Sequence, residues 1–431
     1  MYRKFYNTLT SWENNKTKEP LLVVGARQVG KTWIIRKFCE DVYSDYIYLN
    51  FESNPELISI FEGKLEPSHI INQLEILTDK KITVETAIFF DEIQRCERAI
   101  TSLKYFCESD LNYRVIGAGS LLGVKLYRFE SSFPVGKVVI KYMYPLDFEE
   151  FLLACGKESL RDAITDAYTN LKALPVAIHD KAIHCYQDYL FIGGMPQCVN
   201  DYVNHECNVI HFDRSIQSNL ILAYSADMTK HTTSAAEGVK INEVYQSVPR
   251  QLAKENPKFK YKEVRTHANK RDFKEPLDWL NASNMIYRIC KTDVPSSPLK
   301  AYADEDNFKV YLSDVGLLSS LSEIQYRDIQ ASEHNIYKGA ITENYVVQTL
   351  VSKGLTLYYY KPSDSMEIDL LLDDNGSIVP VEIKSGRHKR SRSLVNYCEK
   401  HSPDKAIRIS ENNFGKKDNL ISIPLYAVFC L

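Results

Sequence analysis

The sequence lacks any run of apolar residues that approaches the roughly 18 needed to cross a membrane as a helix. The segment from Met1 to Tyr6 also lacks the apolar core of a secretion signal peptide. The ten cysteines are scattered singly and form no C-x-x-C pair, which argues against a zinc knuckle and against a disulfide framework. Together these absences predict a reduced, cytoplasmic protein with no membrane partner.

An excess of charge of one sign is absent as well. The formal net charge is -3, and contents of 44% hydrophobic and 25% charged residues are ordinary for a globular protein. The overall charge therefore says nothing about partners, and local charge must decide. At 431 residues the chain is too long for one ordinary core, which suggests about three domains.

The most informative segment that is present fits G-x-x-x-x-G-K-[ST]: Gly25, Ala26, Arg27, Gln28, Val29, Gly30, Lys31 and Thr32. A short apolar strand, residues 21–24, precedes it, and a helix is expected from Trp33 onward, which is the context that a phosphate-binding loop requires. Backbone N–H groups of such a loop cradle phosphates at a helix N-terminus. We expect ATP and Mg²⁺ as cofactors, with Lys31 on the β- and γ-phosphates, Thr32 on the metal, and Trp33 among the nucleotide-binding residues.

A second apolar run, residues 87–90, ends in Asp91 and Glu92. A buried parallel strand would deliver these acids at its carboxyl edge. We expect Asp91 to hold Mg²⁺ through water and Glu92 to polarise the attacking water. The alternative is an ordinary strand followed by a solvated acidic turn. The phosphate-binding loop upstream makes this alternative less favoured. Ser120, after the strand at 113–117, is a candidate γ-phosphate sensor, although a simple glycine-rich turn remains an alternative.

The pattern of expected elements divides the chain into four parts. Residues 1–143 alternate strands and helices and predict a parallel sheet with its nucleotide at the carboxyl edge. Residues 144–232 have helical spacing and predict a helical lid. Within residues 233–325, three short helices near 244–249, 261–266 and 276–284 and two strands at 285–289 and 308–312 predict a winged helix. Residues 326–431 form the last domain.

The middle domain is locally basic. Between Arg250 and Lys274 lie nine basic residues against three acidic ones. Such a face would bind phosphates by releasing counterions, without reading sequence, so DNA is the expected partner. A solvated face or a contact with an acidic neighbouring domain are the alternatives.

The last domain carries a second set of charged residues. Glu343 lies on a helix, Asp369 on the first of two paired strands, and Glu382 and Lys384 share one face of the second. We expect Asp369 and Glu382 to bridge Mg²⁺ or Mn²⁺, Glu343 to bind it directly or through water, and Lys384 to orient or deprotonate a water. Residues 384–392 add a cluster suited to backbone phosphates. A structural ion-pair network is the alternative, and whether such a fold still cleaves stays open.

With these motifs placed, the chain resembles a large family of prokaryotic AAA-type ATPases joined to a C-terminal domain of unknown function related to PD-(D/E)xK nucleases. The resemblance covers nearly the whole length and rests on the phosphate-binding loop and on segments 90–94, 119–120, 144–151, 193–196, 311–318 and 382–386. It implies an α/β fold: a P-loop AAA-type ATPase domain with a helical lid, a winged-helix middle domain, and a C-terminal α/β restriction-endonuclease-like domain.

The same resemblance implies ATP binding and hydrolysis, a homo-oligomer by analogy of fold, and an acid order similar to that of archaeal Holliday-junction resolvases. Some relatives have Gly-Arg where this chain has Gly136-Lys137, so an arginine finger is not carried over to that position. Arg95 and Arg128 are the substitute candidates.

Two functions follow from the sequence. The first is an ATP-hydrolysing enzyme that acts on DNA, with branched DNA as the favoured substrate class. The second is a nucleotide-controlled regulatory or defence switch, whose C-terminal domain binds a protein or nucleic acid without cutting. A metabolic P-loop kinase is a weaker third option, because a small-molecule kinase needs no second acidic site far downstream.

Overall fold

The computed structural model describes residues 1–15, 19–127, 133–230, 232, 234–254, 257–331, 336–363, 366–387 and 392–431. The chain folds into two compact units. The N-terminal unit comprises Arg3–Tyr144 and Ala282–Asn284, and the C-terminal unit comprises Met1–Tyr2, Pro145–Asn281 and Met285–Leu431. Among the described helices, none combines the length and apolar character that crossing a bilayer requires.

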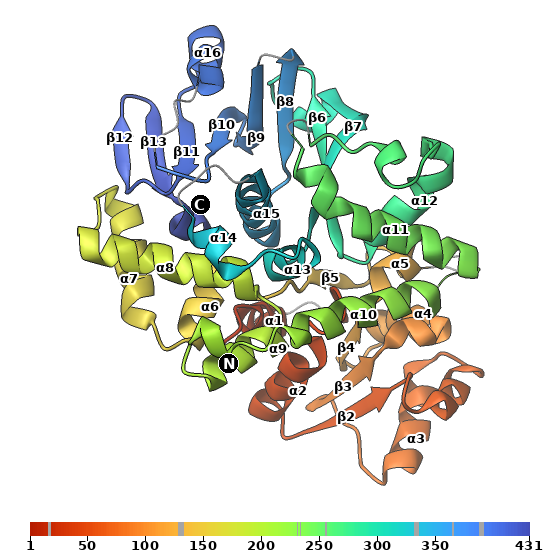
Figure 1. Ribbon diagram of the computed structural model, residues 1–431. Helices are drawn as coiled ribbons and strands as arrows, with labels where there is room; N and C mark the ends of the chain where they lie inside the picture. Colours follow the sequence, from red (N-terminus) through yellow and green to blue (C-terminus); the bar gives the residue numbers. More distant parts are fainter. Residues whose placement is uncertain are drawn as a thin grey trace. The chain divides into compact units, whose positions relative to one another are not determined.

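Within its described residues, the N-terminal unit holds a parallel sheet of five strands in the order β2-β3-β4-β1-β5 (Figure 1). The strands are β1 (Leu21–Val24), β2 (Asp45–Asn50), β3 (Thr86–Asp91), β4 (Arg114–Gly119) and β5 (Val139–Tyr142). Parallel pairing brings all carboxyl ends to one edge, and the register aligns Val24 with Gly119, Ala118 with Asp91, and Asp91 with Asn50. The expected α/β, parallel-sheet character of this region is confirmed.

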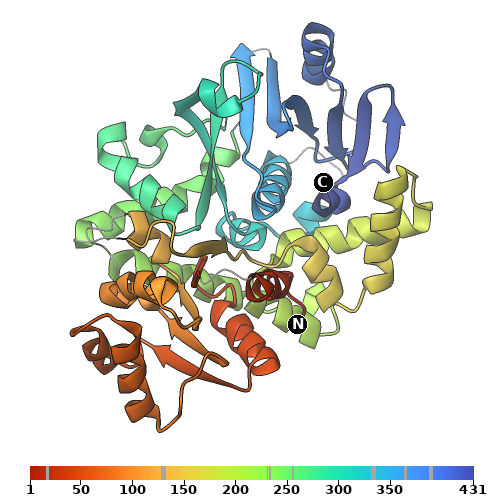
Figure 2. The ribbon, with the colours of Figure 1, turned by 180° about the vertical axis from the view of Figure 1, so that it is seen from behind.

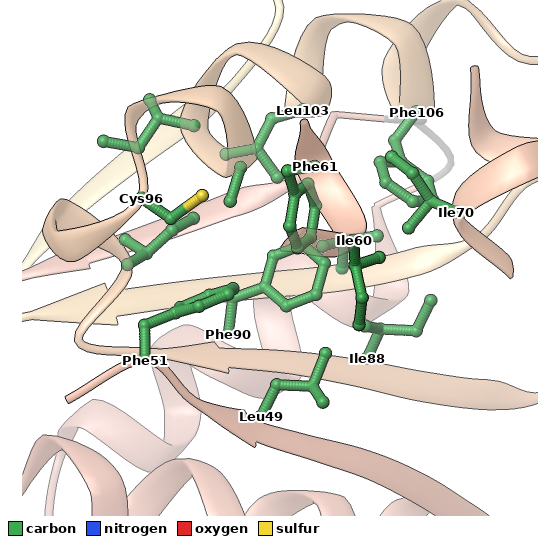
Figure 3. Packing of buried hydrophobic residues seen from close by; sticks show 14 of the residues in the cluster. Leu49, Phe51, Ile60, Phe61, Ile70, Ile88, Phe90, Cys96, Leu103 and Phe106 are labelled. Carbon is green, nitrogen blue, oxygen red and sulfur yellow. The ribbon is translucent and has the colours of Figure 1, made fainter. Parts of the chain in front are cut away.

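Helices flank this sheet: α1 (Phe5–Asn14), α2 (Lys31–Val42), α3 (Pro67–Thr78), α4 (Glu97–Glu108) and α5 (Leu122–Tyr127). Alternate strand residues such as Ile88 and Phe90 join a core with α3 and α4. Figure 3 shows the rings of Phe51, Phe61 and Phe90 gathered there, and their centroids lie 5.6 to 5.9 Å apart. This packing supports the strands that end at the nucleotide edge.

The C-terminal unit begins with helices α6 (Phe148–Ala154), α7 (Glu158–Asn170), α8 (Val176–Ile192), α9 (Pro196–Asn204) and α10 (Ser215–Lys230). Asp147 and Glu150 form a capping box at the start of α6, because the Asp147 side chain accepts from the Glu150 N–H while Glu150 accepts from the Asp147 N–H. The helices expected to form a lid therefore share a compact unit with the C-terminal sheet.

Within the described part of this unit, a mixed sheet of eight strands runs in the order β12-β13-β11-β10-β9-β8-β6-β7. Its strands are β6 (Ile286–Thr292), β7 (Ala303–Leu312), β8 (Tyr358–Ser363), β9 (Met366–Asp374), β10 (Ser377–Ile383), β11 (Ala406–Ser410), β12 (Gly415–Lys417) and β13 (Leu420–Pro424). The β6–β7 hairpin joins the rest of the sheet because β6 pairs in parallel with β8. The hairpin is thus continuous with the C-terminal sheet.

The remaining helices are α11 (Ala235–Leu252), α12 (Lys270–Ala282), α13 (Val315–Leu321), α14 (Tyr326–Gln330), α15 (Ile336–Ser352) and α16 (Arg392–His401). In both Figure 1 and Figure 2, α15 lies beside the C-terminal sheet, and it contacts β7 and β10. The helix expected over residues 261–266 is only a 3-10 turn, Tyr261–Glu263. So short a segment gains too few hydrogen bonds to offset the cost of nucleating an α-helix.

Two glycines let α8 and α13 meet at backbone distance. A Cβ on Gly316 would lie 2.4 Å from the Ile192 carbonyl oxygen and 2.6 Å from the Gly193 Cα. Asp314, fully buried, accepts hydrogen bonds from the Gly194 N–H at 2.6 Å and the Leu317 N–H at 2.9 Å. The motifs at 193–196 and 311–318 are therefore explained by packing.

Candidate functional site

The predicted phosphate-binding loop connects β1 to α2. Gln28 and Gly30 have φ angles of 63° and 96°, in the left-handed region, which turns successive N–H groups inward. The Lys31 ammonium is buried and donates to the carbonyl oxygens of Gly25 and Ala26, both at 2.8 Å. Burial lowers the pKa of Lys31 to about 8, against the opposing effect of Glu92 and Asp91. A buried cation that donates to neutral carbonyl oxygens matches a site for an anionic ligand.

Asp91 lies at the end of β3 beside the loop. Its Oδ2 accepts from the hydroxyls of Thr32 and Tyr48, both at 2.9 Å, and from the Asn50 amide at 3.3 Å. Burial raises the pKa of Asp91, whereas the bonds from Thr32 and Tyr48 lower it. The structure thus brings Thr32 and Asp91 together, as a shared Mg²⁺ would require.

Glu92 follows with a φ of 50°, in the left-handed region, directly after the end of β3. Its Oε2 accepts from the Gln94 amide, and from the N–H and hydroxyl of Ser120 at 3.4 and 3.3 Å. Gly119 leaves room for Gln94, because a Cβ there would lie 1.8 Å from the Gln94 Oε1. Glu92 and Ser120, which the sequence proposed separately, therefore meet through one carboxylate oxygen.

Two arginines converge on Glu52 after the end of β2. The Arg95 guanidinium lies 2.7 Å from the Glu52 carboxylate, and that of Arg27 lies 3.7 Å from it. Trp33, on the first turn of α2, is 48% exposed. Arg128, the other candidate finger, lies outside the described residues.

These residues fit a Mg²⁺–nucleotide. Thr32 and Asp91 would hold the metal, and Lys31 with the inward N–H groups would hold the phosphates. Glu92 is positioned by Gln94 and Ser120, and its carboxylate can accept a proton from water. The arrangement is thus suited to phosphoryl transfer to water.

The C-terminal sheet gathers a second set of predicted residues. Lys384 pairs with the Glu382 Oε1, and the Asp369 Oδ2 accepts from the Ile383 N–H at 2.7 Å. Burial and the neighbouring Glu343 raise the pKa of Asp369 to about 7, although Lys384 lowers it. Glu343, Asp369, Glu382 and Lys384 are therefore brought to one place, on α15, β9 and the end of β10.

A lysine that was not predicted from the sequence lies against this cluster. Lys309 of β7 is 1% exposed and lies 2.9 Å from Glu343 and 2.8 Å from Glu367. Burial by itself lowers the pKa of Lys309, but Glu343, Tyr311 and Glu367 outweigh it and raise the pKa well above its ordinary value. Tyr311 also donates to Glu343 at 2.6 Å. Lys309 thus compensates the charge of Glu343 and Glu367 from within the chain.

Among the described residues, no group of three or more His, Cys, Asp or Glu side chains is arranged to hold a metal ion. Within the same described part of the chain, the Glu382 Oε2 is buried without a hydrogen-bond partner. The expected Mg²⁺ or Mn²⁺ site at Glu343, Asp369 and Glu382 therefore has a ligand atom to offer but not an assembled set of ligands.

The basic segment 250–274 is partly neutralised by acids around it. Lys254 lies 2.7 Å from Glu263, and Arg265 lies 2.6 Å from Glu243. Lys270 pairs with Asp306. Arg271 and Lys274 on α12 are exposed. Residues 255–256 of this segment and 388–391 of the cluster 384–392 lie outside the described residues.

Sequence reasoning missed Tyr48, Asn50, Gln94 and Lys309. Tyr48 and Asn50 lie two positions apart near the end of β2, so their side chains share one face of the strand, and this pattern could have identified them. Gln94 stands directly after the acidic pair. Lys309 gave no local signal, because its partners are distant in sequence.

Comparisons with known proteins divide the chain in three. Residues 17–152 match the protein family described as AAA domain. Residues 183–328 match a domain of unknown function (DUF8612), and residues 338–427 match another (DUF4143). Among curated proteins, no match to the chain was found.

Solved structures similar to the chain include a Walker-type ATPase of Pyrococcus abyssi, with 14% identity, coverage of 74% of this chain and 95% of that one, and a TM-score of 0.46. The Aeropyrum pernix ORC1 protein in complex with DNA has 13% identity, coverage of 76% and 93%, and a TM-score of 0.31. The replication initiator DnaA bound to AMPPCP and single-stranded DNA has 15% identity, coverage of 64% and 84%, and a TM-score of 0.29.

The family match spans the strand, loop and helix that carry Lys31 and Thr32, together with the strand that ends in Asp91. The parallel sheet and the geometry of its carboxyl edge agree with that match. Residues 17–152 therefore form an AAA-type P-loop ATPase domain.

Proposed function

We propose that this protein hydrolyses ATP and uses the energy to act on DNA, with branched DNA as its favoured substrate class. The observation that carries the proposal is the carboxyl edge of the N-terminal sheet, where Thr32 bonds to Asp91 at 2.9 Å and Glu92 follows. In this proposal Mg²⁺ would supply charge neutralisation on the phosphates, while Glu92 accepts the proton of the attacking water.

Support for a DNA-binding module comes from the middle of the chain. Helix α11, the 3-10 turn, α12 and the β6–β7 hairpin follow one another as in a winged helix. In addition, the Phe259 N–H donates to the Phe308 carbonyl of β7 at 2.8 Å, which ties the segment between α11 and α12 to the hairpin. Helix α12 would then be the recognition helix.

The charges of α12 agree with this role. Arg271 and Lys274 are exposed and lie three residues apart, so they share one face of the helix. Because Lys254, Arg265 and Lys270 already have acidic partners, we expect Arg271 and Lys274 to contribute most of the contacts to phosphates. The protein is further proposed to assemble as a homo-oligomer, with Arg95 as a candidate finger for a neighbouring subunit.

For the C-terminal domain we propose a nuclease-like metal site. Glu343, Asp369 and Glu382 would hold Mg²⁺ or Mn²⁺, and Lys384 would orient a water. The buried and unpartnered Glu382 Oε2 supports this assignment within the described residues, because a buried carboxylate oxygen without a donor is costly unless a ligand completes it.

A second candidate function is a nucleotide-controlled regulatory or defence switch, whose C-terminal domain binds without cutting. Lys309 favours this alternative. Its ammonium already bridges Glu343 and Glu367, so the charge of these two carboxylates is compensated within the chain without a metal.

The test is ATP hydrolysis with Mg²⁺, alone and with duplex, single-stranded and four-way-junction DNA, with Lys31→Ala as the blank. We expect one DNA form to stimulate turnover, and Glu92→Gln to keep nucleotide binding while hydrolysis is lost. Turnover that is indifferent to every DNA would favour the switch.

Cleavage is tested on the same DNA forms with Mg²⁺ or Mn²⁺. Asp369→Ala and Lys384→Ala are the variants expected to abolish it. If the wild-type protein cuts none of these substrates, the active-nuclease form of the proposal fails.

A further inference from the structure

The Arg3 side chain donates hydrogen bonds to two backbone segments of the N-terminal unit that are far apart in the sequence. It precedes α1 and is 5% exposed. One terminal nitrogen donates to the Val29 carbonyl oxygen at 2.9 Å, and the other donates to the Tyr144 carbonyl oxygen at 2.6 Å. Neither contact was expected from the sequence, because Arg3 and Tyr144 are 141 positions apart.

The Val29 contact controls the direction of a peptide group in the phosphate-binding loop. In a trans peptide, the carbonyl of one residue and the N–H of the next point in opposite directions. Drawing the Val29 carbonyl toward Arg3 therefore turns the Gly30 N–H away from Arg3. Gly30 is left-handed, with a φ of 96°, so this N–H belongs to the set that lines the loop.

The Tyr144 contact links the same loop to the end of the N-terminal unit, since the chain leaves this unit after Tyr144. The preceding residue, Met143, donates to the Val24 carbonyl at 2.7 Å. Its own carbonyl oxygen lies where a Cβ on Gly25 would be, at 2.2 Å. Segment 143–144 thus touches the loop directly at Gly25 and through Arg3 at Val29.

We propose that Arg3 is a positioning residue for nucleotide binding, which holds the Val29–Gly30 peptide in its phosphate-binding orientation and links the loop to Tyr144. This inference rests on the proposed ATP binding of the loop. A lysine at this position can satisfy only part of the role, because a single ammonium lacks the planar fork that reaches both carbonyls.

The test compares Arg3→Met and Arg3→Lys with the wild-type full-length protein, using a fluorescent ADP analogue for affinity and steady-state hydrolysis for kcat and KM. We expect Arg3→Met to weaken affinity and raise KM by about tenfold, the effect of losing one charged hydrogen bond, while kcat changes less than about threefold. The affinity and the KM of Arg3→Lys should lie between those of the wild type and those of Arg3→Met. Such a split between KM and kcat distinguishes positioning of the loop from a general loss of fold.

Arg98→Met is the control for the loss of a guanidinium that bonds to backbone, at a more exposed position. Arg98 also donates to two backbone carbonyls of the same unit, those of Phe61 and Gly63, but away from the phosphate-binding loop. We expect it to lower the melting temperature without changing nucleotide affinity.

If folded Arg3→Met and Arg3→Lys bind the analogue as tightly as the wild type, the role of Arg3 is overturned while the proposed function stands. If Arg3→Met fails to fold, Arg3→Lys alone decides by the same criterion. A wild-type protein without nucleotide affinity would overturn the proposed function, and the role of Arg3 with it.

Discussion

At the scale of single residues, Lys309 decides between the two candidate roles of the C-terminal domain. It is a buried cation whose partners are carboxylates on α15 and β9. A divalent metal at Glu343 and Asp369 would have to compete with this internal charge. The same residue therefore compensates the charge of Glu343 and Glu367 and would oppose a metal at the proposed site.

We predict that Lys309→Met raises the affinity for Mn²⁺ by at least about tenfold, because the competing ammonium is gone. Metal-free Lys309→Met should lose about 3–5 kcal/mol of stability, since Glu343 and Glu367 lose the buried cation that they share. Calorimetric titration with Mn²⁺ in the absence of nucleotide measures the affinity, and urea unfolding measures the stability.

Lys361→Met serves as the control, because Lys361 also pairs with Glu367, at 2.9 Å, but is half-buried. It should change both quantities far less. Asp369→Asn in the Lys309→Met background should remove the added affinity. Tight Mn²⁺ binding by the wild type, unchanged in Lys309→Met, would show that Lys309 does not compete with metal.

At the scale of elements, the crossing of α8 and α13 depends on two glycines. We predict that Gly316→Ala lowers the free energy of unfolding by about 3 kcal/mol, because the new methyl group meets backbone atoms that no rotamer change can move. Chemical denaturation measures the change.

Gly339→Ala is the comparison, since nothing lies within 4 Å of a Cβ at that helical position. It should stabilise the protein by about 0.5–1 kcal/mol through the higher helix propensity of alanine. Equal effects of the two substitutions would contradict the close crossing.

Asp314, at the start of α13, makes the same crossing sensitive to pH. Burial raises its pKa to about 6 in the folded protein from an ordinary value of 3.8, despite the N–H groups that bond to it. Between about pH 4 and pH 6 the Asp314 carboxyl is ionised in the unfolded chain but still protonated in the folded protein. The free energy of unfolding therefore falls as the pH rises through this range, and the loss is complete above it.

We therefore predict that the free energy of unfolding of the wild type, measured relative to Asp314→Asn, falls by about 2–3 kcal/mol between pH 4 and pH 7. Urea unfolding at several pH values measures it. Asn does not titrate, so other groups cancel in the difference. A difference that is constant with pH would show that Asp314 is not the group responsible.

At the scale of the whole molecule, the two compact units have separate sheets. The phosphate-binding loop and Asp91 of the AAA-type ATPase domain lie in the N-terminal unit. We predict two unfolding transitions in calorimetry. Mg²⁺–ATP at 100 times its Kd should increase the free energy of unfolding of the N-terminal unit by about 2.7 kcal/mol and leave that of the C-terminal unit unchanged.

Lys31→Ala should retain both transitions and lose the shift. A single transition that moves as a whole with ATP would instead mean that the two units unfold as one cooperative body.

Sequence reasoning succeeded where the information is local. The strand, loop and helix around Lys31 and the strand ending in Asp91 were predicted, because a buried apolar run and a glycine-rich loop restrict the backbone wherever they occur. The residues Glu343, Asp369, Glu382 and Lys384 were likewise brought together as their order suggested. The prediction of a helix over residues 261–266 was wrong, because so short a segment does not form enough hydrogen bonds to offset the cost of helix nucleation.

By itself, the sequence thus determined that the N-terminal part is an α/β nucleotide-binding sheet and that Lys31, Thr32 and Asp91 stand at its edge. Only the tertiary structure decided that Lys309 neutralises the C-terminal carboxylates, that the β6–β7 hairpin continues the C-terminal sheet, and that Arg3 holds the phosphate-binding loop. The reason is physical. These contacts join residues far apart in the chain, and their energy depends on distances and burial that exist only after folding.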